Sequence, residues 1–243
     1  MGLLPITAAT QVRRHAERQS VDRSELDAIL SQAYVAHVAC CVEGEPLVLP
    51  LTCAPDGQRL LLHGSTGSRL VRLASAGAPL AVTVTLLDGL VYARSLFAST
   101  MNYRSVVAYG RARVVPGAEK MAALRALSEH LMPGRWDEVR APTARELAAT
   151  GVLALPLDQC SVKVRRGGPS DDESGATVWA GVLPLHTVAG EPQPAATMRP
   201  GTPVPGSVEN LVARLGEGAV PGGRTRLVGG WPARSGSEDD RVV

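Results

Sequence analysis

The stretch YVAHVACCVEGEPLVLPLTCAPDGQRLLLHGS, residues 34–65, decides the fold of this chain. It contains three runs rich in β-branched and other apolar residues. Two turn signals, GEP at residues 44–46 and PDG at residues 55–57, separate these runs. The pattern therefore predicts three consecutive antiparallel strands joined by tight turns.

The sequence on either side of this stretch adds helices and further strands. Asp22 and Glu25 supply an N-cap and an acidic third residue for a helix that ends near Leu30. The segment LAVTVTLL alternates apolar residues with Thr83 and Thr85, as a half-buried strand does. Further strands are expected at residues 103–115, 151–157, 161–166 and 178–185, and further helices at residues 70–77, 119–131 and 143–149. This order favours a mainly β fold, a small barrel with peripheral helices, over a βαβ sheet.

The chain of 243 residues is long enough to bury one sizeable core. Glycine and proline account for 27 of residues 1–190 and for 16 of residues 191–243, so their density doubles toward the C-terminus. We therefore expect a flexible N-terminus at residues 1–12, one folded domain at residues 13–189 and a disordered Gly/Pro-rich tail at residues 190–243.

The composition disfavours several classes of function. The 25 Lys and Arg residues nearly balance the 23 Asp and Glu residues, which disfavours nucleic acid as the main partner. No apolar run reaches the ~18 residues of a membrane span, and the N-terminus does not have the charge order of a signal peptide. Four cysteines without a CxxC pair and five scattered histidines predict free thiols in a reducing cytoplasm and no metal site. A cytoplasmic protein is the expectation.

The segment HGSTGSR, residues 63–69, is the first candidate for a binding site. It lies where a predicted strand ends and a helix begins, a junction that favours anions through unpaired backbone N–H groups. Its hydroxyl groups and the guanidinium of Arg69 suit phosphate oxygens, and Gly64 would let the backbone approach a phosphate closely. An ordinary capped loop with a solvated Arg69 explains the same residues, so both interpretations stand at this level.

The segment MNYRS, residues 101–105, is the second candidate. Strand alternation places Tyr103 and Ser105 on one face and Arg104 on the other. A polar strand start explains this segment equally well. His37 lies in an apolar strand and is predicted to be a core or interface imidazole. Neither GxSxG nor HExxH occurs, which leaves hydrolase chemistry without support.

Several longer blocks resemble one known family. These blocks are RRHAERQSVDRSELDAIL, LHGSTGSRLVR, AVTVTLLDGLVYARS, MNYRSVVAYG, HLMPGRWDEVRAPTARELAATGVLALPL and VWAGVLPL. They are similar to the flavin-nucleotide-binding proteins related to pyridoxamine 5′-phosphate oxidase, a group that includes the nitroimidazole-resistance proteins. The resemblance runs from about Arg13 to Ala189. It implies a split β-barrel that forms a homodimer and holds FMN at the subunit interface.

The resemblance also assigns roles to the two candidate segments. It makes residues 63–69 an expected FMN phosphate site and places residues 103–105 at the cofactor pocket, with Thr85 facing the flavin beside Thr83. The expected cofactor-binding residues are His63, Gly64, Ser65, Thr66, Ser68, Arg69, Thr83, Tyr103, Arg104 and Ser105. One departure is that Ala98 and Ser99 stand where family members carry two histidines. Any contact of those imidazoles with substrate, metal or haem is therefore lost here.

The implied function is that of an FMN-dependent oxidoreductase that reduces a small molecule, such as a nitro compound, a quinone or a flavin. FMN is expected ahead of FAD, a deazaflavin or haem. A non-catalytic flavin or haem carrier is one alternative, and an amine oxidase acting on a pyridoxamine-phosphate-type substrate is another. The second alternative needs another phosphate site, for which only Lys163, Arg165 and Arg166 are available. No residue has the pairing expected of a general acid or base.

Overall fold

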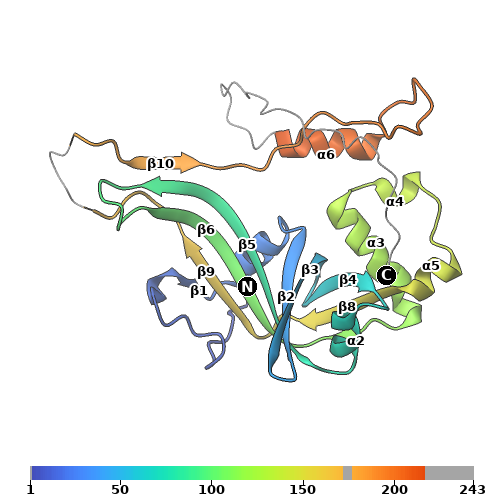
Figure 1. Cartoon of the computed structure of the whole chain (residues 1–243), viewed down its shortest axis with the longest axis horizontal. Coiled ribbons are helices and arrows are strands. Elements are labelled where there is room, and N and C mark those ends of the chain that lie inside the picture. Colours follow the sequence, from blue (N-terminus) through green and yellow to red (C-terminus); the bar gives the residue numbers. More distant parts are fainter. Residues whose placement is uncertain (1, 172–176, 217–243) are drawn as a thin grey trace, which may run out of the picture.

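The computed structural model describes residues 2–171 and 177–216 (Figure 1). The predicted three-stranded meander is confirmed as β2 (Val35–Val42), β3 (Glu45–Asp56) and β4 (Arg59–Ser65). Its turns place Gly44 at φ 87° and Gly57 at φ 62°, left-handed conformations that glycine adopts without strain.

The remaining strands extend the meander into a sheet that curves back on itself. These strands are β1 (Gln19–Ser20), β5 (Pro79–Tyr92), β6 (Thr100–Arg111), β7 (Arg113–Val114), β8 (Thr150–Pro156) and β9 (Cys160–Arg165). Their order is β1-β9-β6-β5-β2-β3-β4-β8-β7, and the neighbours are antiparallel. Only Ala112 separates β6 from β7, so one bent segment pairs with β5 at one end and with β8 at the other. This connection closes the sheet into a barrel.

Helices cover the barrel and complete its core. The helices are α1 (Arg23–Leu30), α2 (Arg69–Ser75), α3 (Gly117–Leu131), α4 (Arg135–Glu138), α5 (Ala144–Ala149) and α6 (Gly206–Gly216), with a 3-10 turn η1 at Ala16–Arg18. The predicted cap of α1 is confirmed, since the Asp22 carboxylate accepts a hydrogen bond from the Ser24 N–H. The capping box of α5 is also present between Thr143 and Glu146. One apolar core fills the barrel beneath α1 and α2, and a second lies between α3 and strands β3, β4 and β8.

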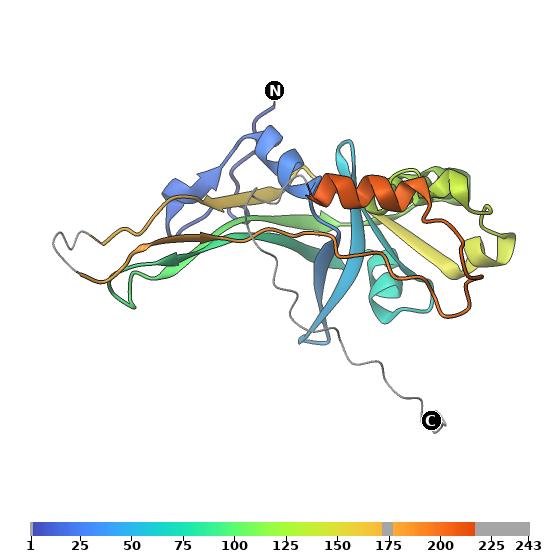
Figure 2. The same cartoon turned by 90° about the horizontal axis from the view of Figure 1, so that it is seen from above.

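An arm projects from one side of the barrel (Figures 1 and 2). It consists of the outer halves of β5 and β6 together with β10 (Gly181–Pro184), which pairs with β5 beyond the end of β2. A bulge between Leu87 and Gly89 marks where the arm leaves the barrel. A Cβ on Gly89 would lie 2.9 Å from the Leu183 carbonyl oxygen, so β10 can pair here only because residue 89 is glycine. The strand expected at residues 178–185 is therefore shorter than its apolar pattern suggested.

Both ends of the described chain make contacts that local sequence does not reveal. Near the N-terminus, within residues 1–12 that were expected to be flexible, Leu4 and Thr10 are buried. Within the segment expected to be a disordered tail, α6 places Ser207 against α4, where its hydroxyl donates to a Glu138 carboxylate oxygen at 2.5 Å. The rest of that segment, residues 217–243, lies outside the described residues.

Candidate functional site

The end of β4, the loop that follows it and the first residue of α2 contain six of the expected residues. The Ser65 hydroxyl accepts from the Gly67 N–H at 3.2 Å, and the Ser65 carbonyl accepts from the Ser68 N–H at 3.0 Å. Thr66 is bound to the end of α5, because its N–H and hydroxyl both donate to the carbonyl of Ala149, the last residue of that helix, at 3.0 and 3.1 Å. The loop is thus held by hydrogen bonds within its own turn and to the end of α5.

Gly64 has a structural role within this loop. It pairs with Gly151 on β8, and both glycines lie beneath Val71 of α2. A Cβ on Gly64 would lie 3.0 Å from the Val71 Cγ2 atom, and one on Gly151 would lie 2.8 Å from its Cγ1 atom. These two glycines let α2 pack closely on the sheet. The lack of a side chain at residue 64 is therefore explained by helix packing.

Arg69 and Ser68 present the polar groups of the loop to solvent. Arg69 is exposed and forms no ion pair with any residue that the structure describes. Ser68 is the N-cap residue of α2, yet its hydroxyl makes no capping hydrogen bond. At the end of β4, desolvation lowers the pKa of His63, which keeps its imidazole neutral near pH 7. Of His63 and Arg69, only the Arg69 guanidinium therefore carries a charge near pH 7.

The other expected residues lie on the outer face of the sheet. Thr83 stands opposite His37 of β2 on one side and Val107 of β6 on the other. Thr85 stands opposite Ser105. Because directly opposed residues share a face, these hydroxyl side chains line one surface with Tyr103. The sequence predicted Tyr103 and Ser105 on one face of the strand and Arg104 on the other, and this register agrees with that prediction.

Arg104 lies on the opposite face of β6. Its Nη2 and Nε atoms donate to the two carboxylate oxygens of Asp88 at 2.7 and 2.9 Å, and Nη2 also donates to Gln32 at 3.2 Å. The hydrogen bonds with Asp88 raise the pKa of this guanidinium. Since Asp88 is the bulged residue of β5, Arg104 stabilises the base of the arm and does not join Tyr103 and Ser105.

Within one chain, the structure does not gather the loop and the outer-face residues into one compact site. Strands β3, β2 and β5 lie between β4, which carries His63, and β6, which carries Tyr103. Four strand spacings of about 4.8 Å separate these two strands along the sheet. His37 lies between the two groups and is exposed in the single chain, which excludes the core position and leaves the interface position a prediction. It alternates with the buried Ala36 and Val38, so the period of its strand places it on the outer face.

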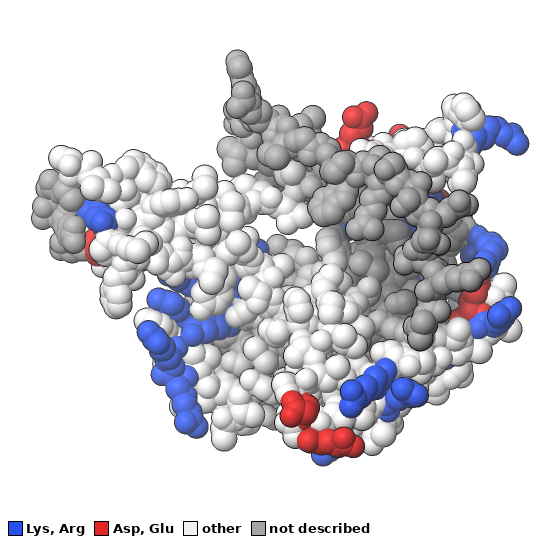
Figure 3. All heavy atoms as spheres, viewed as in Figure 1, with Lys and Arg blue, Asp and Glu red and all other residues white. Residues whose placement is uncertain are grey.

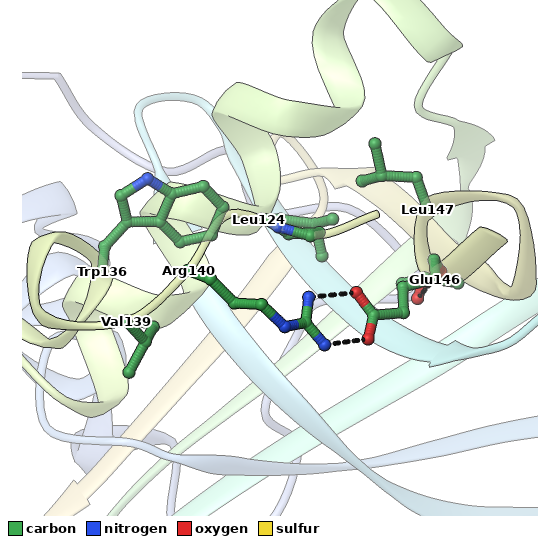
Figure 4. A pocket seen from close by; sticks show the side chains of 8 residues that line it. Leu124, Trp136, Val139, Arg140, Glu146 and Leu147 are labelled. Carbon is green, nitrogen blue, oxygen red and sulfur yellow. Dashed lines mark hydrogen bonds and ion pairs between the residues drawn. The ribbon is translucent and has the colours of Figure 1, made fainter. Parts of the chain in front are cut away.

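A cavity of about 510 Å³ lies between α3, α4 and α5 and was not predicted from the sequence (Figure 4). The Arg140 guanidinium crosses it and binds both carboxylate oxygens of Glu146 at 2.6 and 2.8 Å. These hydrogen bonds, with those from Thr143, lower the pKa of Glu146 to about 2. The lining residues are Leu124, Trp136, Val139, Arg140, Pro142, Glu146, Leu147 and Thr150. The capping box predicted α5, but no signal in the sequence indicated the cavity.

The thiols and the histidines of the described residues offer little further chemistry. Burial raises the pKa of Cys53 and of Cys160 to about 12, so both thiols remain protonated. Within residues 2–171 and 177–216, no group of three or more His, Cys, Asp or Glu side chains is placed to hold a metal ion. In the same segments, no helix has the length and apolar character needed to cross a membrane.

An antiparallel sheet closed through one bent strand, with helices at its ends, defines the class of split β-barrels. The sequence profile described as pyridoxamine 5′-phosphate oxidase matches residues 22–164. The chain belongs to this family, which confirms the family expected from the sequence. No curated protein sequence matches the chain.

Two solved structures are similar over nearly their whole length. The FAD and heme binding protein from Mycobacterium smegmatis is 42% identical, with a TM-score of 0.78 over 80% of this chain and 97% of that one. The flavocytochrome Anf3 from Azotobacter vinelandii is 36% identical, with a TM-score of 0.79 over 84% of this chain and 97% of that one. A candidate 5-nitroimidazole antibiotic resistance protein from Bacteroides thetaiotaomicron shares the fold, at 22% identity and a TM-score of 0.52 over 60% of this chain and 86% of that one.

Proposed function

We propose that this chain is a homodimeric flavin-binding redox protein. The observation that carries the proposal is its similarity, at 42% and 36% identity, to two structures described as an FAD and heme binding protein and a flavocytochrome. FMN was the cofactor expected from the sequence. The relative described as an FAD and heme binding protein favours FAD, and a flavin nucleotide of either kind has the phosphate and the flat ring that the candidate residues would have to hold.

The loop at residues 65–69 is the proposed phosphate site. Ser68 and Arg69 carry donors that are free for a ligand within the described part of the chain, and a guanidinium binds phosphate oxygens in a bidentate manner. His63 would bind as a neutral imidazole, through a hydrogen bond rather than a charge. A neutral imidazole and a charged guanidinium would therefore have different parts in holding the phosphate.

The outer face of β5 and β6 is the proposed ring site. The Thr83 hydroxyl donates to the Val106 carbonyl at 3.2 Å, and the Ser105 hydroxyl donates to the Lys163 carbonyl at 3.3 Å. Because these protons are committed to the backbone, both oxygens face a ligand as hydrogen-bond acceptors. A bound flavin would supply the electron transfer, and these residues would orient its ring.

Reduction of a small molecule, such as a nitro compound, a quinone or a flavin, is favoured over oxidation of a pyridoxamine-phosphate-type amine. The second phosphate site that the amine needs would have to come from three basic residues that already have partners. Lys163 donates to the Arg14 carbonyl at 3.0 Å, and Arg166 pairs with Glu25 at 2.7 Å. Arg165 is buried and donates to the Gly168 carbonyl at 3.2 Å.

A flavocytochrome that also holds haem is the second candidate function, because the names of both similar structures include haem or cytochrome. The chain offers His37 on β2 and His63 on β4 as imidazoles on the same face of the sheet, with β3 between their strands. Haem iron commonly takes a histidine as its axial ligand. Ser99, which stands in place of a family histidine, closes a loop of the arm through its hydroxyl instead.

The absorbance spectrum of the purified protein tests this proposal, with mass spectrometry of the cofactor released on denaturation. Flavin bands and a released mass of FAD or FMN are the expected result, and an added Soret band that His37→Ala removes would support the flavocytochrome. A colourless protein that binds neither flavin on titration would contradict the proposal. Anaerobic reoxidation of the reduced protein by a nitroimidazole, a quinone or a free flavin then tests the reaction.

A further inference from the structure

The tip of the arm holds apolar side chains in solvent. The loop at residues 93–99 joins β5 to β6, and its Leu96 and Phe97 side chains are 93% and 101% exposed. Trp179 lies beside this loop with its ring centroid 5.9 Å from that of Tyr92, and it is 66% exposed. We call Leu96, Phe97 and Trp179 the arm tip.

Hydrogen bonds hold this loop in one conformation. The Asp171 carboxylate accepts from the backbone N–H groups of Arg94 and Ser95 at 2.6 and 3.0 Å. The Ser99 hydroxyl donates to the Ser95 carbonyl at 3.0 Å and accepts from the Ala93 N–H at 3.1 Å. A loop bound in this way loses little further freedom on docking, which favours association.

The cavity between α3, α4 and α5 is a complementary surface at the other end of the molecule. Leu124, Trp136, Val139 and Leu147 give it apolar walls, and it opens to solvent (Figure 4). Figure 1 places the arm and these helices on opposite sides of the barrel. The arm tip therefore cannot reach the cavity of its own chain.

Resting on the homodimer proposed above, we infer that the arm tip of each copy docks into the α3–α4–α5 cavity of a second copy. Phe97 enters the cavity and lies against Trp136, an aromatic contact that both rings favour. A two-fold axis makes the same contact twice and leaves neither arm tip in solvent. One chain thus carries both halves of the contact.

The surface between the arm tip and the cavity suits such an interface. Val35, Val48 and Leu87 are 51%, 54% and 45% exposed on the outer face of the sheet. Figure 3 shows an uncharged surface that runs along the arm and onto the barrel, and charged residues are depleted from interface cores. Phe97 and Trp179 from two arms would bury roughly 600–1,000 Å². When the cavity walls that these side chains cover are counted as well, the total buried area reaches the ~1,200–2,000 Å² of a stable interface.

Light scattering and sedimentation of charge variants test this inference. Phe97→Glu in the arm tip and Leu147→Lys in the cavity should each weaken self-association by about 100-fold or more. Leu3→Glu and Ala148→Lys change exposed side chains that belong neither to the arm tip nor to the lining of the cavity, so these controls should remain dimers. Mixing the two monomeric variants should restore a heterodimer, because one contact is then native and the other joins Glu to Lys. Circular dichroism and thermal midpoints verify that each variant is folded.

Persistence of the Phe97→Glu dimer would overturn the inference, as would two folded monomeric variants that do not associate when mixed. A Leu147→Lys protein that stays dimeric but loses flavin would assign the cavity to the cofactor instead. Flavin absorbance in the same samples separates the two proposals. A dimer without flavin contradicts the proposed function alone, whereas a flavin-bound Phe97→Glu dimer contradicts only this inference.

Discussion

The barrel and the arm place apolar side chains in opposite environments. Leu62 and Val82 in the barrel are 0% and 1% exposed, whereas Phe97 and Trp179 on the arm are 101% and 66% exposed. Contiguous apolar patches in solvent are uncommon on monomeric proteins and mark interaction sites. The comparison indicates that the barrel supplies the stability of the fold and that the arm supplies a surface for association.

The largest effect that separates the two regions is the cost of removing a leucine side chain. Leu62→Ala leaves a cavity among fully buried residues and should lower the free energy of unfolding by about 2–5 kcal/mol. Leu96→Ala removes a side chain in contact with solvent and should change it by no more than about 0.5 kcal/mol. Urea denaturation at a protein concentration that keeps the chain monomeric measures both values. Equal costs would show that the arm is part of the folding core.

A second pair of variants compares two glycines that permit close packing. Gly151→Ala places a Cβ 2.8 Å from Val71 beneath α2 and should lower the free energy of unfolding of the barrel by about 1–3 kcal/mol. Gly89→Ala places a Cβ 2.9 Å from the Leu183 carbonyl oxygen and should separate β10 from β5. Hydrogen exchange at residues 181–185 should then accelerate while the thermal midpoint of the barrel stays unchanged. Global unfolding in both variants would contradict the independence of the arm.

The Arg140–Glu146 pair gives a smaller, pH-dependent effect at the cavity end of the barrel. Its hydrogen bonds lower the pKa of Glu146 from 4.5 to about 2, so its stabilising contribution is present above pH 4.5 and is lost as the pH falls toward 2. Carboxyl titration by nuclear magnetic resonance should show this low pKa in the wild-type chain. Arg140→Gln should raise it toward the ordinary value, and an unchanged titration would exclude the ion pair in solution.

The smallest expected effect is the contribution of His63 to the pH dependence of folding stability. Desolvation lowers its pKa in the folded chain, so the unfolded chain binds more protons as the pH falls through the ordinary value of 6.5. The folded state should therefore lose stability between pH 7 and pH 5, and His63→Asn should reduce this loss. Thermal midpoints across this range measure it, with His15→Asn on the exposed N-terminal segment as the control. Identical pH profiles in all three proteins would show that His63 is not desolvated.

Local patterns predicted the elements whose signals lie within a few residues. The turns at residues 44–46 and 55–57, the Asp22 cap and the capping box at Thr143 all determine local backbone geometry, and the structure confirms each of them. The face of Tyr103 and Ser105 also followed from alternation, because a strand has a period of two residues.

Features that depend on distant residues were not visible in the sequence. The contact of α6 with Glu138, the burial of Leu4 and the place of β10 on β5 each join segments far apart in the chain. The ion pair of Arg104 with Asp88 also joins two strands, and alternation placed Arg104 on its face without naming this partner. The close approach of Gly64 to Val71 of α2 was likewise not visible in the sequence.

The proposed flavin phosphate site at residues 65–69 can be tested most directly by flavin binding. Flavin titration of the wild-type chain, Arg69→Ala and Arg72→Ala measures this, because Arg72 is an exposed arginine on the same helix. Loss of a charged hydrogen bond should weaken flavin binding in Arg69→Ala by about 1.5–3 kcal/mol without unfolding the chain, and Arg72→Ala should bind as the wild type does. Equal flavin affinity in all three proteins would contradict the phosphate site.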